Sequence, residues 1–385
     1  MRKPIFLDHH STTPVEPAVF NAMQPWFVES YGNPHSSDHA WGWQAEAAIE
    51  EARAKVADLI GARPADVIFT SGATESNNLA LFGAAEGLPA NQRHVIVTAT
   101  AHPCIAGVAD RLEMREFEVT RLYPRADGLY ALEKLADALR PETGLVSIEA
   151  AHHEIGTIQP ISEIAAVLSS RGIIFHTDAA QAAGKIPLDV ADIDLMSLSA
   201  HKLYGPKGIG ALYVRWRPGF TVTPMFVGGG QQRGLRPGTI PTPLAVGFGE
   251  ACEIAGQRMA QDGYQLAGLR DRLLSGLRAG LPDLVVNGGL ESRLAHNLNV
   301  RLPGIVASDL LYELRETIAI SAGSACASAR IEPSPSLLAL GLTEAEALSS
   351  IRIGLGRQNT QADVDIAISA IIAAYDKLIA ATRVA

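Results

Sequence analysis

Cysteine is scarce in this sequence. The 385 residues contain only three cysteines, Cys104, Cys252 and Cys326. They form no CxxC pair, and an odd number of cysteines cannot be paired off completely within one chain. This pattern argues against a disulfide-stabilised secreted scaffold and fits a reducing compartment. We therefore expect a cytoplasmic protein.

Long hydrophobic runs are missing as well. The chain begins MRKPIFLDHH, in which only three apolar residues precede Asp8 after the first proline. This start is too short for a secretory signal, and no later run approaches the roughly 20 apolar residues that a membrane-spanning helix needs. We therefore expect no association with a membrane.

Positive charge is also in deficit, with 32 Lys and Arg residues against 41 Asp and Glu residues and a net charge of −9. A nucleic-acid-binding face needs clustered Lys and Arg, so we expect no direct nucleic-acid binding. The segment HHEIG at 152–156 differs from the HExxH zinc motif, and no Cys/His spacing matches a zinc site. We expect no bound metal.

The sequence does contain a regular alternation of short apolar runs with helix-patterned segments. The runs have the character of buried strands: DVIFTSG, RHVIVTATAH, TGLVSIEAAHHE, GIIFHTDAAQ, IDLMSLSAHK and GIGALYVRW. Segments such as ISEIAAVLSSRG have helical spacing. This alternation predicts an α/β fold with an open, mostly parallel central sheet.

The pattern changes from about residue 255. A long helical segment leads to short strand-like pieces around HNLNVRLPG, and the chain closes with a helix that starts at a capping box formed by Thr360 and Asp363. These features predict a smaller α+β domain at the C-terminal end.

Polar residues follow most of the predicted strands. They are Thr70-Ser71-Gly72, Ala101-His102, His152-His153-Glu154, Asp178 and the run from Ser199 to Lys202. Because ligands bind outside the carboxyl ends of the strands in open α/β sheets, these residues are candidates for one site. Together they suit an anionic, aromatic ligand that can be protonated.

Two of these residues indicate the chemistry of the site. A buried Asp178 is costly unless it meets a cation, which could be a protonated pyridine nitrogen or the partner in a structural ion pair. Lys202 directly follows a strand, where a lysine usually extends to the surface. Beside Ser199 and His201, and downstream of Asp178, a Schiff-base lysine is the better interpretation. The TSGATESNN turn could hold a phosphate at a helix N-terminus, although by itself it reads as a plain capped helix.

Cys326 lies in the stretch SAGSACASA, which has no large apolar residue within four positions. A free cysteine is usually a small buried hydrophobe, and this stretch offers nothing to pack against. Small residues around a cysteine could mark a tight turn, or a segment that carries a nucleophile to the solvent. Cys104 and Cys252 are most simply packing residues, and Cys104, two residues after His102, could also lie near the site.

The order of these motifs resembles the NifS/IscS-like cysteine desulfurases, which are pyridoxal-phosphate enzymes of the class V aminotransferase group. The likeness extends over nearly the whole chain and rests on LDHHSTTPVEP, YGNPHSSDHAWGWQAE, FTSGATESNN, EIGTIQPI, HTDAAQAAGK, SAHKLYGPKGIGALYVR, GGGQQRGLRPGT, GSACASARIEPS and SIRIGLGR. The resemblance implies a large PLP-binding domain at 15–257, a small α+β domain made of 1–14 and 258–385, and a homodimer with its sites at the interface.

The resemblance also implies roles for individual residues. Lys202 matches the catalytic lysine that forms the Schiff base with the cofactor, and Asp178 the acid that binds the pyridinium nitrogen. Gln181 matches the ligand of the ring hydroxyl, and His102 the catalytic histidine stacked on the ring. Cys326 matches the cysteine that accepts the substrate sulfur.

Further positions match the remainder of the family's site. Ala73, Thr74, Ser199 and His201 match cofactor-binding positions, the last three of them as phosphate ligands. Thr239 matches a phosphate ligand that reaches across from the other subunit. Arg352 matches the residue that clamps the substrate carboxylate, a task suited to a guanidinium fork. Asn33 belongs to the matching Asn-Pro segment near the substrate.

The sequence departs from the family pattern at four positions. His153 stands where the family usually has an Asn that contacts the cofactor hydroxyl, and Ala101 replaces a common Glu. His9 and His10 replace a Tyr and a small residue near the substrate entrance. These departures concern substrate handling and the electronics of the cofactor ring, and they leave the central residues in place.

The implied activity is conversion of L-cysteine to L-alanine, with transfer of the sulfur to Cys326 as a persulfide and then to an acceptor protein. Iron–sulfur scaffolds and sulfurtransferases for thio-cofactor, tRNA or DNA modification are the acceptors of such enzymes. Two alternatives share the same cofactor residues. One is a selenocysteine lyase, and the other is a class V aminotransferase or lyase that forms no persulfide.

Overall fold

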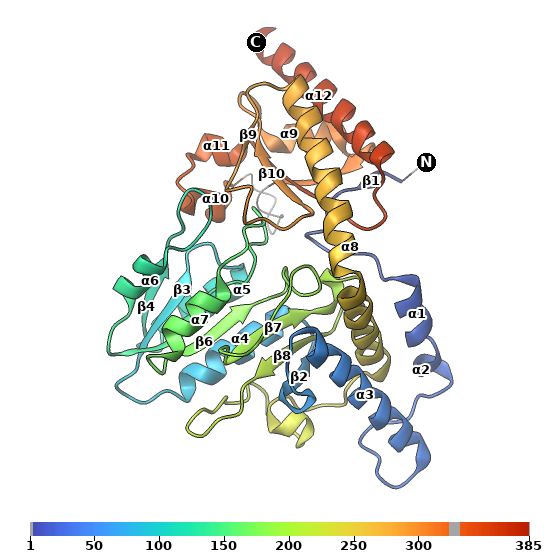
Figure 1. Ribbon diagram of the computed structural model, residues 1–385, viewed down its shortest axis with the longest axis vertical. Helices are drawn as coiled ribbons and strands as arrows, with labels where there is room; N and C mark the ends of the chain where they lie inside the picture. Colours follow the sequence, from blue (N-terminus) through green and yellow to red (C-terminus); the bar gives the residue numbers. More distant parts are fainter. Residues whose placement is uncertain (1–2, 323–331, 385) are drawn as a thin grey trace.

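The computed structural model describes residues 3–322 and 332–384 of the chain. A large sheet with flanking helices forms the lower part of the molecule in Figure 1, and a smaller sheet with its helices forms the upper part. The long helix α8 (Thr242–Gly280) runs between the two.

The large sheet has seven strands in the order β2-β8-β7-β6-β5-β3-β4. Pairing is parallel except at β8, which runs antiparallel to both neighbours. The strands are β2 (Val67–Thr70), β3 (His94–Thr98), β4 (Glu118–Leu122), β5 (Thr143–Ser147), β6 (Ile174–Asp178), β7 (Leu195–Ser199) and β8 (Gly210–Val214). The predicted α/β fold with a mostly parallel central sheet is confirmed.

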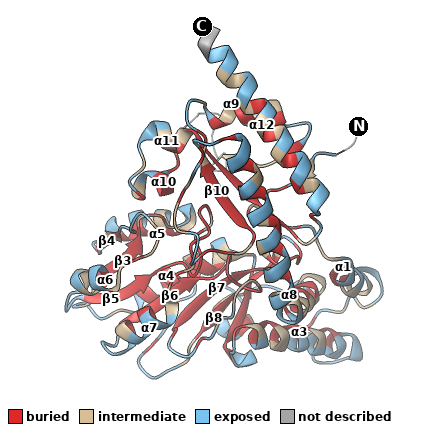
Figure 2. Ribbon diagram, turned by 45° about the horizontal axis from the view of Figure 1, so that its top comes forward, coloured by how far each residue is buried: buried red, intermediate tan, exposed pale blue. Residues whose placement is uncertain are grey.

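Helices cover both faces of the sheet, so every residue of six of these strands is buried. Strands buried on both faces have largely apolar sequences, and this is why the sequence predicted these six. Figure 2 shows these strands as continuously buried. The edge strand β4 was missed. Its Glu118 is exposed and Arg121 is half-buried, so its sequence lacks an apolar run.

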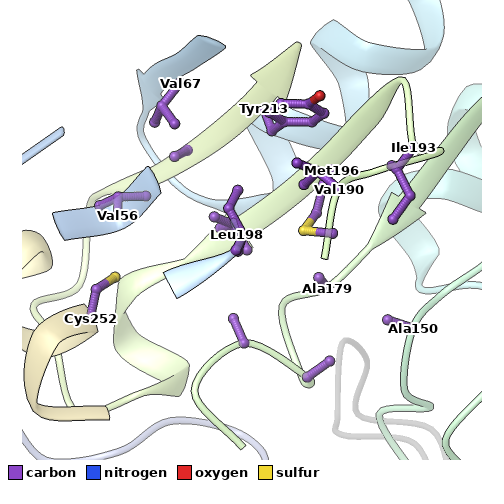
Figure 3. Packing of buried hydrophobic residues seen from close by; sticks show 14 of the residues in the cluster. Val56, Val67, Ala150, Ala179, Val190, Ile193, Met196, Leu198, Tyr213 and Cys252 are labelled. Carbon is purple, nitrogen blue, oxygen red and sulfur yellow. The ribbon is translucent and has the colours of Figure 1, made fainter. Parts of the chain in front are cut away.

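Alternate residues of each strand point to opposite faces of the sheet. In β3, Ile96 packs into the core beneath α3 (Ala40–Leu59), α7 (Ile161–Ser169) and the first half of α8. Its neighbours Val95 and Val97 pack on the other face, against α4 (Ala73–Glu86) and α5 (Pro103–Glu113). Figure 3 shows the first of these cores around Leu198 and Met196.

Shorter elements complete the lower part of the molecule. They are the helices α1 (Pro17–Met23), α2 (Pro25–Val28) and α6 (Leu132–Ala138), and the 3-10 turns η1 (Pro64–Asp66), η2 (Ala200–Lys202) and η3 (Gln231–Gly234).

The smaller sheet has the strand order β12-β13-β10-β9, and β1 pairs with β11 beside it. The strands are β1 (Ile5–Phe6), β9 (Val285–Val286), β10 (Asn297–Arg301), β11 (Ile318–Ala319), β12 (Ser321–Ala322) and β13 (Ser350–Gly354), and the helices are α9 (Ala307–Leu314), α10 (Pro335–Ala339), α11 (Glu344–Leu348) and α12 (Gln361–Val384). At the start of α12, Asp363 and Thr360 exchange backbone and side-chain hydrogen bonds of 2.9 and 3.2 Å, as predicted.

Helix α8 belongs to both cores. Phe248 and Cys252 in its first half pack on the large sheet, whereas Leu273 and Leu277 in its second half pack in the core of the smaller sheet. The sequence predicted only its second half as a long helix, although α8 begins at Thr242. The predicted domain boundary at residue 257 falls inside α8 and stays a prediction.

Across residues 3–322 and 332–384, the helices are all too short or too polar to cross a bilayer.

Gly249 permits the close approach of α8 to α3. A Cβ atom at this position would lie 2.7 Å from Cα of Ala52, whereas a Cβ at Gly268 of the same helix would contact nothing within 4 Å. We expect Gly249→Ala to lower the free energy of unfolding by about 1–3 kcal/mol because α3 must move. Gly268→Ala should instead raise it by up to about 1 kcal/mol through helix propensity. Chemical denaturation of both variants tests this, and equal effects would contradict it.

Buried histidines make the stability depend on pH. Burial lowers the pKa of His176, in β6, from 6.5 to about 3. Below pH 6.5 the unfolded chain binds a proton that the folded chain does not, so stability falls as the pH drops towards 3. Between pH 7 and pH 5 this histidine should account for a loss of about 2 kcal/mol.

The variant His176→Gln should therefore lose about 2 kcal/mol less than the wild type between these two pH values, as measured by denaturant titration. The control is His35→Gln, which makes the same substitution at an exposed position. A wild-type pH dependence in His176→Gln would show that this histidine does not contribute.

Candidate active site

A cavity of about 520 Å³ lies at the carboxyl ends of β2, β3, β5, β6 and β7. This is where an open α/β sheet places its ligand, and the volume is that of a small-molecule site. Most of the residues that line it follow these strands, and the N-terminal segment and β13 complete the wall. The lining includes His10, Ser11, Ser71–Glu75, His102, Cys104, Glu149, His153, Asp178, Gln181, Ser199, His201, Lys202, Lys207 and Arg352.

Lys202 lies in the 3-10 turn η2, directly after β7. Its Nζ donates hydrogen bonds to the carbonyl oxygens of His10 at 2.6 Å and Ser11 at 2.8 Å. Burial, followed by the positive charge of Arg352, lowers the pKa of Lys202 from 10.5 to about 8. A substantial fraction of this amine is therefore unprotonated near neutral pH.

Asp178 ends β6 and is buried. Its Oδ2 accepts a hydrogen bond from Asn77 Nδ2 at 2.7 Å, and its Oδ1 accepts one from the backbone N–H of Ala180 at 2.9 Å. Among the described residues, none forms an ion pair with this carboxylate within 4 Å. The structural ion pair considered above is thus absent from this part of the chain, and a cationic ligand in the cavity would supply the missing charge.

His102 caps the N-terminus of α5 and faces the cavity. Its Nδ1 accepts a hydrogen bond from the backbone N–H of Cys104 at 3.3 Å, which leaves the proton of the neutral ring on Nε2. Burial lowers the pKa of His102 and raises that of the Cys104 thiol to about 11. Cys104 thus lines the site as a protonated thiol, whereas Cys252 is a core residue, as predicted.

His153 adds a second imidazole to the same wall. Its ring lies edge-on to His102 with centroids 5.5 Å apart, and it stacks on His152 at 4.7 Å. Burial lowers the pKa of His153 well below 6.5, so the ring is neutral. The histidine that replaces the family's Asn therefore offers a neutral hydrogen-bonding group to the cavity.

Other residues of the cavity lining are donors that suit a phosphate. Helix α4 begins at Ala73, after Gly72 with φ of 146°, and Thr74 follows within the first turn. A helix N-terminus presents free backbone N–H groups to an anion. The side chains of Ser199, His201 and Lys207 line the same cavity.

Arg352 lies in the middle of β13 and is 3% exposed. Its Nη1 donates to the carbonyl oxygen of His153 at 3.1 Å, and its Nη2 donates to Asp8 Oδ1 at 2.8 Å. Its Nε is buried, and among the described residues no group accepts a hydrogen bond from it. The guanidinium also lines the cavity, where it could bind the carboxylate of a ligand.

Three predicted site residues are not placed in this cavity. Asn33 is exposed, and its Oδ1 accepts a hydrogen bond from the backbone N–H of His35 at 3.0 Å. Thr239 is exposed in the segment between η3 and α8. Neither lines the cavity of its own chain. Cys326 lies outside the described residues.

The residues of the cavity fit pyridoxal phosphate. The helix N-terminus and the neighbouring donors suit the phosphate, and the buried carboxylate of Asp178 suits a protonated ring nitrogen. Lys202 supplies a primary amine in the same lining. The cofactor would thus meet complementary groups for its phosphate, its ring nitrogen and its aldehyde.

The sequence did not identify several polar residues of the site. Asn77 lies one turn after Thr74 on α4. This helical spacing could have indicated that both residues lie on the same face of the helix. Glu149 interrupts the apolar end of the β5 run, and its buried carboxyl accepts hydrogen bonds from Thr98 and Thr100 at 2.6 and 3.0 Å. Burial raises the pKa of Glu149. Asp8 had no local signal, because its partner Arg352 is 344 residues away in sequence.

Comparison with known proteins places the chain in a family. The model of the class V aminotransferases matches residues 5–366. The human cysteine desulfurase is 48% identical over 368 residues, which are 95% of this chain and 80% of the human protein. The mitochondrial cysteine desulfurase of Arabidopsis thaliana is 48% identical over 98% of this chain and 83% of its own length.

Solved structures agree with these relatives. A NifS-like protein superimposes with a TM-score of 0.90 at 34% identity and covers 97% of this chain and 100% of its own. The structure of SspA in complex with cysteine superimposes with a TM-score of 0.80 at 39% identity, over 91% of this chain and 98% of its own. The resemblance seen in the sequence is confirmed. The chain belongs to the class V aminotransferases and is a pyridoxal-phosphate-dependent cysteine desulfurase.

Proposed function

We propose that this cysteine desulfurase binds its cofactor in the 520 Å³ cavity, with Lys202 and Asp178 as the central residues. The observation that carries this assignment is a buried carboxylate without a cation in the same cavity as a lysine whose pKa is lowered to about 8. Gln181, His102 and His153 would contact the ring. Ala73, Thr74, Ser199 and His201 would hold the phosphate.

Bound pyridoxal phosphate supplies an electron sink that stabilises negative charge at Cα of an amino acid. Lys202 is the base that accepts the Cα proton at Nζ. A pKa near 8 suits this task, because the amine can be unprotonated at neutral pH and still bind the proton firmly enough to remove it. The carbonyl oxygens of His10 and Ser11 accept hydrogen bonds from the protonated amine and hold it in the cavity.

Arg352 orients the substrate. L-Cysteine carries a carboxylate, and the guanidinium of Arg352 lines the cavity as a cationic partner for it. Asp8 and the carbonyl oxygen of His153 hold the two terminal nitrogens, so the plane of the guanidinium is fixed before the substrate enters. Pre-orientation of this kind lowers the entropic cost of substrate binding.

The thiolate of Cys326 attacks the substrate sulfur. An S–S bond forms, the Cβ–S bond of the substrate breaks with its electron pair staying on Cβ, and protonation of that carbon leads to L-alanine. Only a few per cent of an ordinary thiol is ionised near neutral pH. His102 takes the thiol proton at Nδ1, the ring nitrogen with the lone pair, and releases the hydrogen bond that this atom accepts from the Cys104 N–H. The GSACASA sequence around Cys326 supports this assignment, because its small side chains allow close approach to the substrate sulfur.

The persulfide passes to an acceptor protein, such as an iron–sulfur scaffold or a sulfurtransferase. The position of Thr239, exposed and outside the cavity of its own chain, supports a homodimer in which it acts in the site of the partner chain. Asn33 would lie near the substrate. The separate cores of the two sheets support the division into 15–257 against 1–14 and 258–385. The scarcity of cysteine supports a reducing compartment such as the cytoplasm.

Lys202→Ala and Cys326→Ser separate the cofactor chemistry from the sulfur transfer. We expect Lys202→Ala to lose the visible absorption band of the bound cofactor together with all activity. Cys326→Ser should keep the band and lose sulfide release from L-cysteine by about 100-fold or more, because a hydroxyl is a far weaker nucleophile. Cys252→Ala, in the core, should keep both.

A spectrum and a sulfide assay with thiol reductant suffice for these variants. Full sulfide release by Cys326→Ser would contradict the persulfide assignment and favour a lyase without persulfide chemistry. Faster turnover of L-selenocysteine than of L-cysteine by the wild type, with no loss in Cys326→Ser, would instead favour a selenocysteine lyase.

Arg352→Lys tests the orientation of the substrate. Loss of a charged, fixed donor should raise KM for L-cysteine by about 10- to 100-fold and leave the cofactor band unchanged. Arg258→Lys, on α8 away from the cavity, should leave KM unchanged. An unchanged KM in Arg352→Lys, measured by initial rates of alanine formation, would remove Arg352 from this role.

A further inference from the structure

A chain of hydrogen bonds runs behind Gln181, from β10 and its preceding loop to the wall of the cavity. It links four buried side chains in the order Arg293, Asn297, His10 and Gln181. His10 is one of the positions at which this sequence departs from the family pattern.

The orientation of the Gln181 amide is fixed by its neighbours. One end lies 3.0 Å from the carbonyl oxygen of His10, which can only accept, so this end is the Nε2 donor. The other end is therefore Oε1, and it lies 3.5 Å from Lys185 Nζ. The same Oε1 lies 3.1 Å from Nδ1 of the His10 ring, and this nitrogen must therefore carry a proton.

The other nitrogen of His10 is fixed in the same way. Asn297 Oδ1 accepts from Arg293 Nη1 at 3.0 Å, since a guanidinium can only donate. Asn297 Nδ2 donates to the carbonyl oxygen of Glu154 at 2.9 Å and lies 2.9 Å from His10 Nε2. His10 Nε2 is therefore the acceptor of this bond. The network admits one tautomer of His10, with its proton on Nδ1.

The environment keeps His10 in this neutral form. The ring is 1% exposed and stacks on His296 with centroids 4.3 Å apart and an interplanar angle of 21°. Burial, followed by the nearby His296, lowers the pKa of His10 well below 6.5. Neither hydrogen bond of the ring changes over the pH range in which an enzyme of this kind works.

After these contacts, the Gln181 amide has one donor hydrogen left. Both lone pairs of Oε1 face donors, His10 and Lys185, and one hydrogen of Nε2 is bound to the His10 carbonyl oxygen. The second hydrogen of Nε2 remains for a ligand in the cavity that Gln181 lines. A flipped amide would place Nε2 against two donors and would offer an acceptor to the ligand instead.

We propose that His10 is a positioning residue for the cofactor: as the Nδ1–H tautomer set by Asn297, it holds the Gln181 amide in the orientation that donates to an oxygen of the bound ring. This inference rests on the proposed function, in which Gln181 contacts the ring hydroxyl. The imidazole of His10 acts through Gln181, whereas the backbone carbonyl oxygen of the same residue holds the Lys202 amine.

The test is a double-mutant cycle between His10 and Gln181, read by the dissociation constant for pyridoxal phosphate and by the visible absorption maximum of the holoenzyme. His10→Phe keeps an aromatic ring against His296 and removes both nitrogens. We expect it to weaken cofactor binding about 3- to 10-fold, the amount for one lost hydrogen bond, and to shift the absorption maximum. His10→Gln, which carries both a donor and an acceptor, should restore most of the affinity.

The cycle separates positioning from packing. In a Gln181→Leu background, His10→Phe should cause no further loss of cofactor affinity, because the residue through which it acts is gone. The control is His94→Phe. His94 is equally buried and bonds Thr143 and Thr120 at 2.7 and 2.8 Å, far from the cavity, so this change should lower the melting temperature without changing the dissociation constant.

Unchanged cofactor affinity and spectrum in His10→Phe would overturn the proposal. So would the same fold-loss in the Gln181→Leu background as in the wild type, which would mean that His10 acts independently of Gln181. Should His10→Phe fail to fold, His10→Met takes its place in the cycle, because a flexible thioether fills a similar volume without nitrogen. Failure of the wild type itself to bind pyridoxal phosphate would instead contradict the proposed function.

Discussion

The active site depends on the docking of one short segment, residues 8–13, between the two parts of the molecule. Asp8 holds Arg352 and forms a bridge with Gly354 of the smaller sheet. Two residues later, the carbonyl oxygen of His10 binds the Lys202 amine, and Thr13 binds the backbone of η2. The segment therefore fixes the distance between the proton-accepting amine and the carboxylate-binding guanidinium. Without this segment, Lys202 would be positioned only by the large sheet and Arg352 only by the smaller sheet.

Burial controls the charge of this site more than direct pairing does. The imidazoles of His9, His10, His152, His153 and His296 all have lowered pKa values, and burial is the largest cause for each. Of these rings, His10 and His153 line the cavity as neutral groups. They add polarity without adding cations that would compete with Arg352 for a substrate carboxylate.

The sequence predicted those features that have a local cause. Strands buried on both faces must be continuously apolar, so six strands of the large sheet could be recognised, and the polar residues that follow them gave Asp178 and Lys202. The edge strand β4 and the first half of α8 lacked this signal, since partial exposure and small residues such as Gly249 interrupt the apolar pattern. The contacts of Asp8, Asn77 and Asn297 could not be predicted, because each depends on a tertiary neighbour far away in sequence. The cavity of one chain contains neither Asn33 nor Thr239, although both match site positions of the family.

The pairing of Asp8 with Arg352 also determines when the site can form. The two residues stand near opposite ends of the chain, and the loop between them is almost as long as the protein. During synthesis the ribosome exposes residue 8 long before β13, so the large sheet can begin to fold while the N-terminal segment still lacks its partner. A nascent chain therefore carries Lys202 and the N-terminal end of α4 before Arg352 has been made. The chain can therefore become active only after synthesis has passed β13, and a premature stop codon before β13 yields an inactive protein.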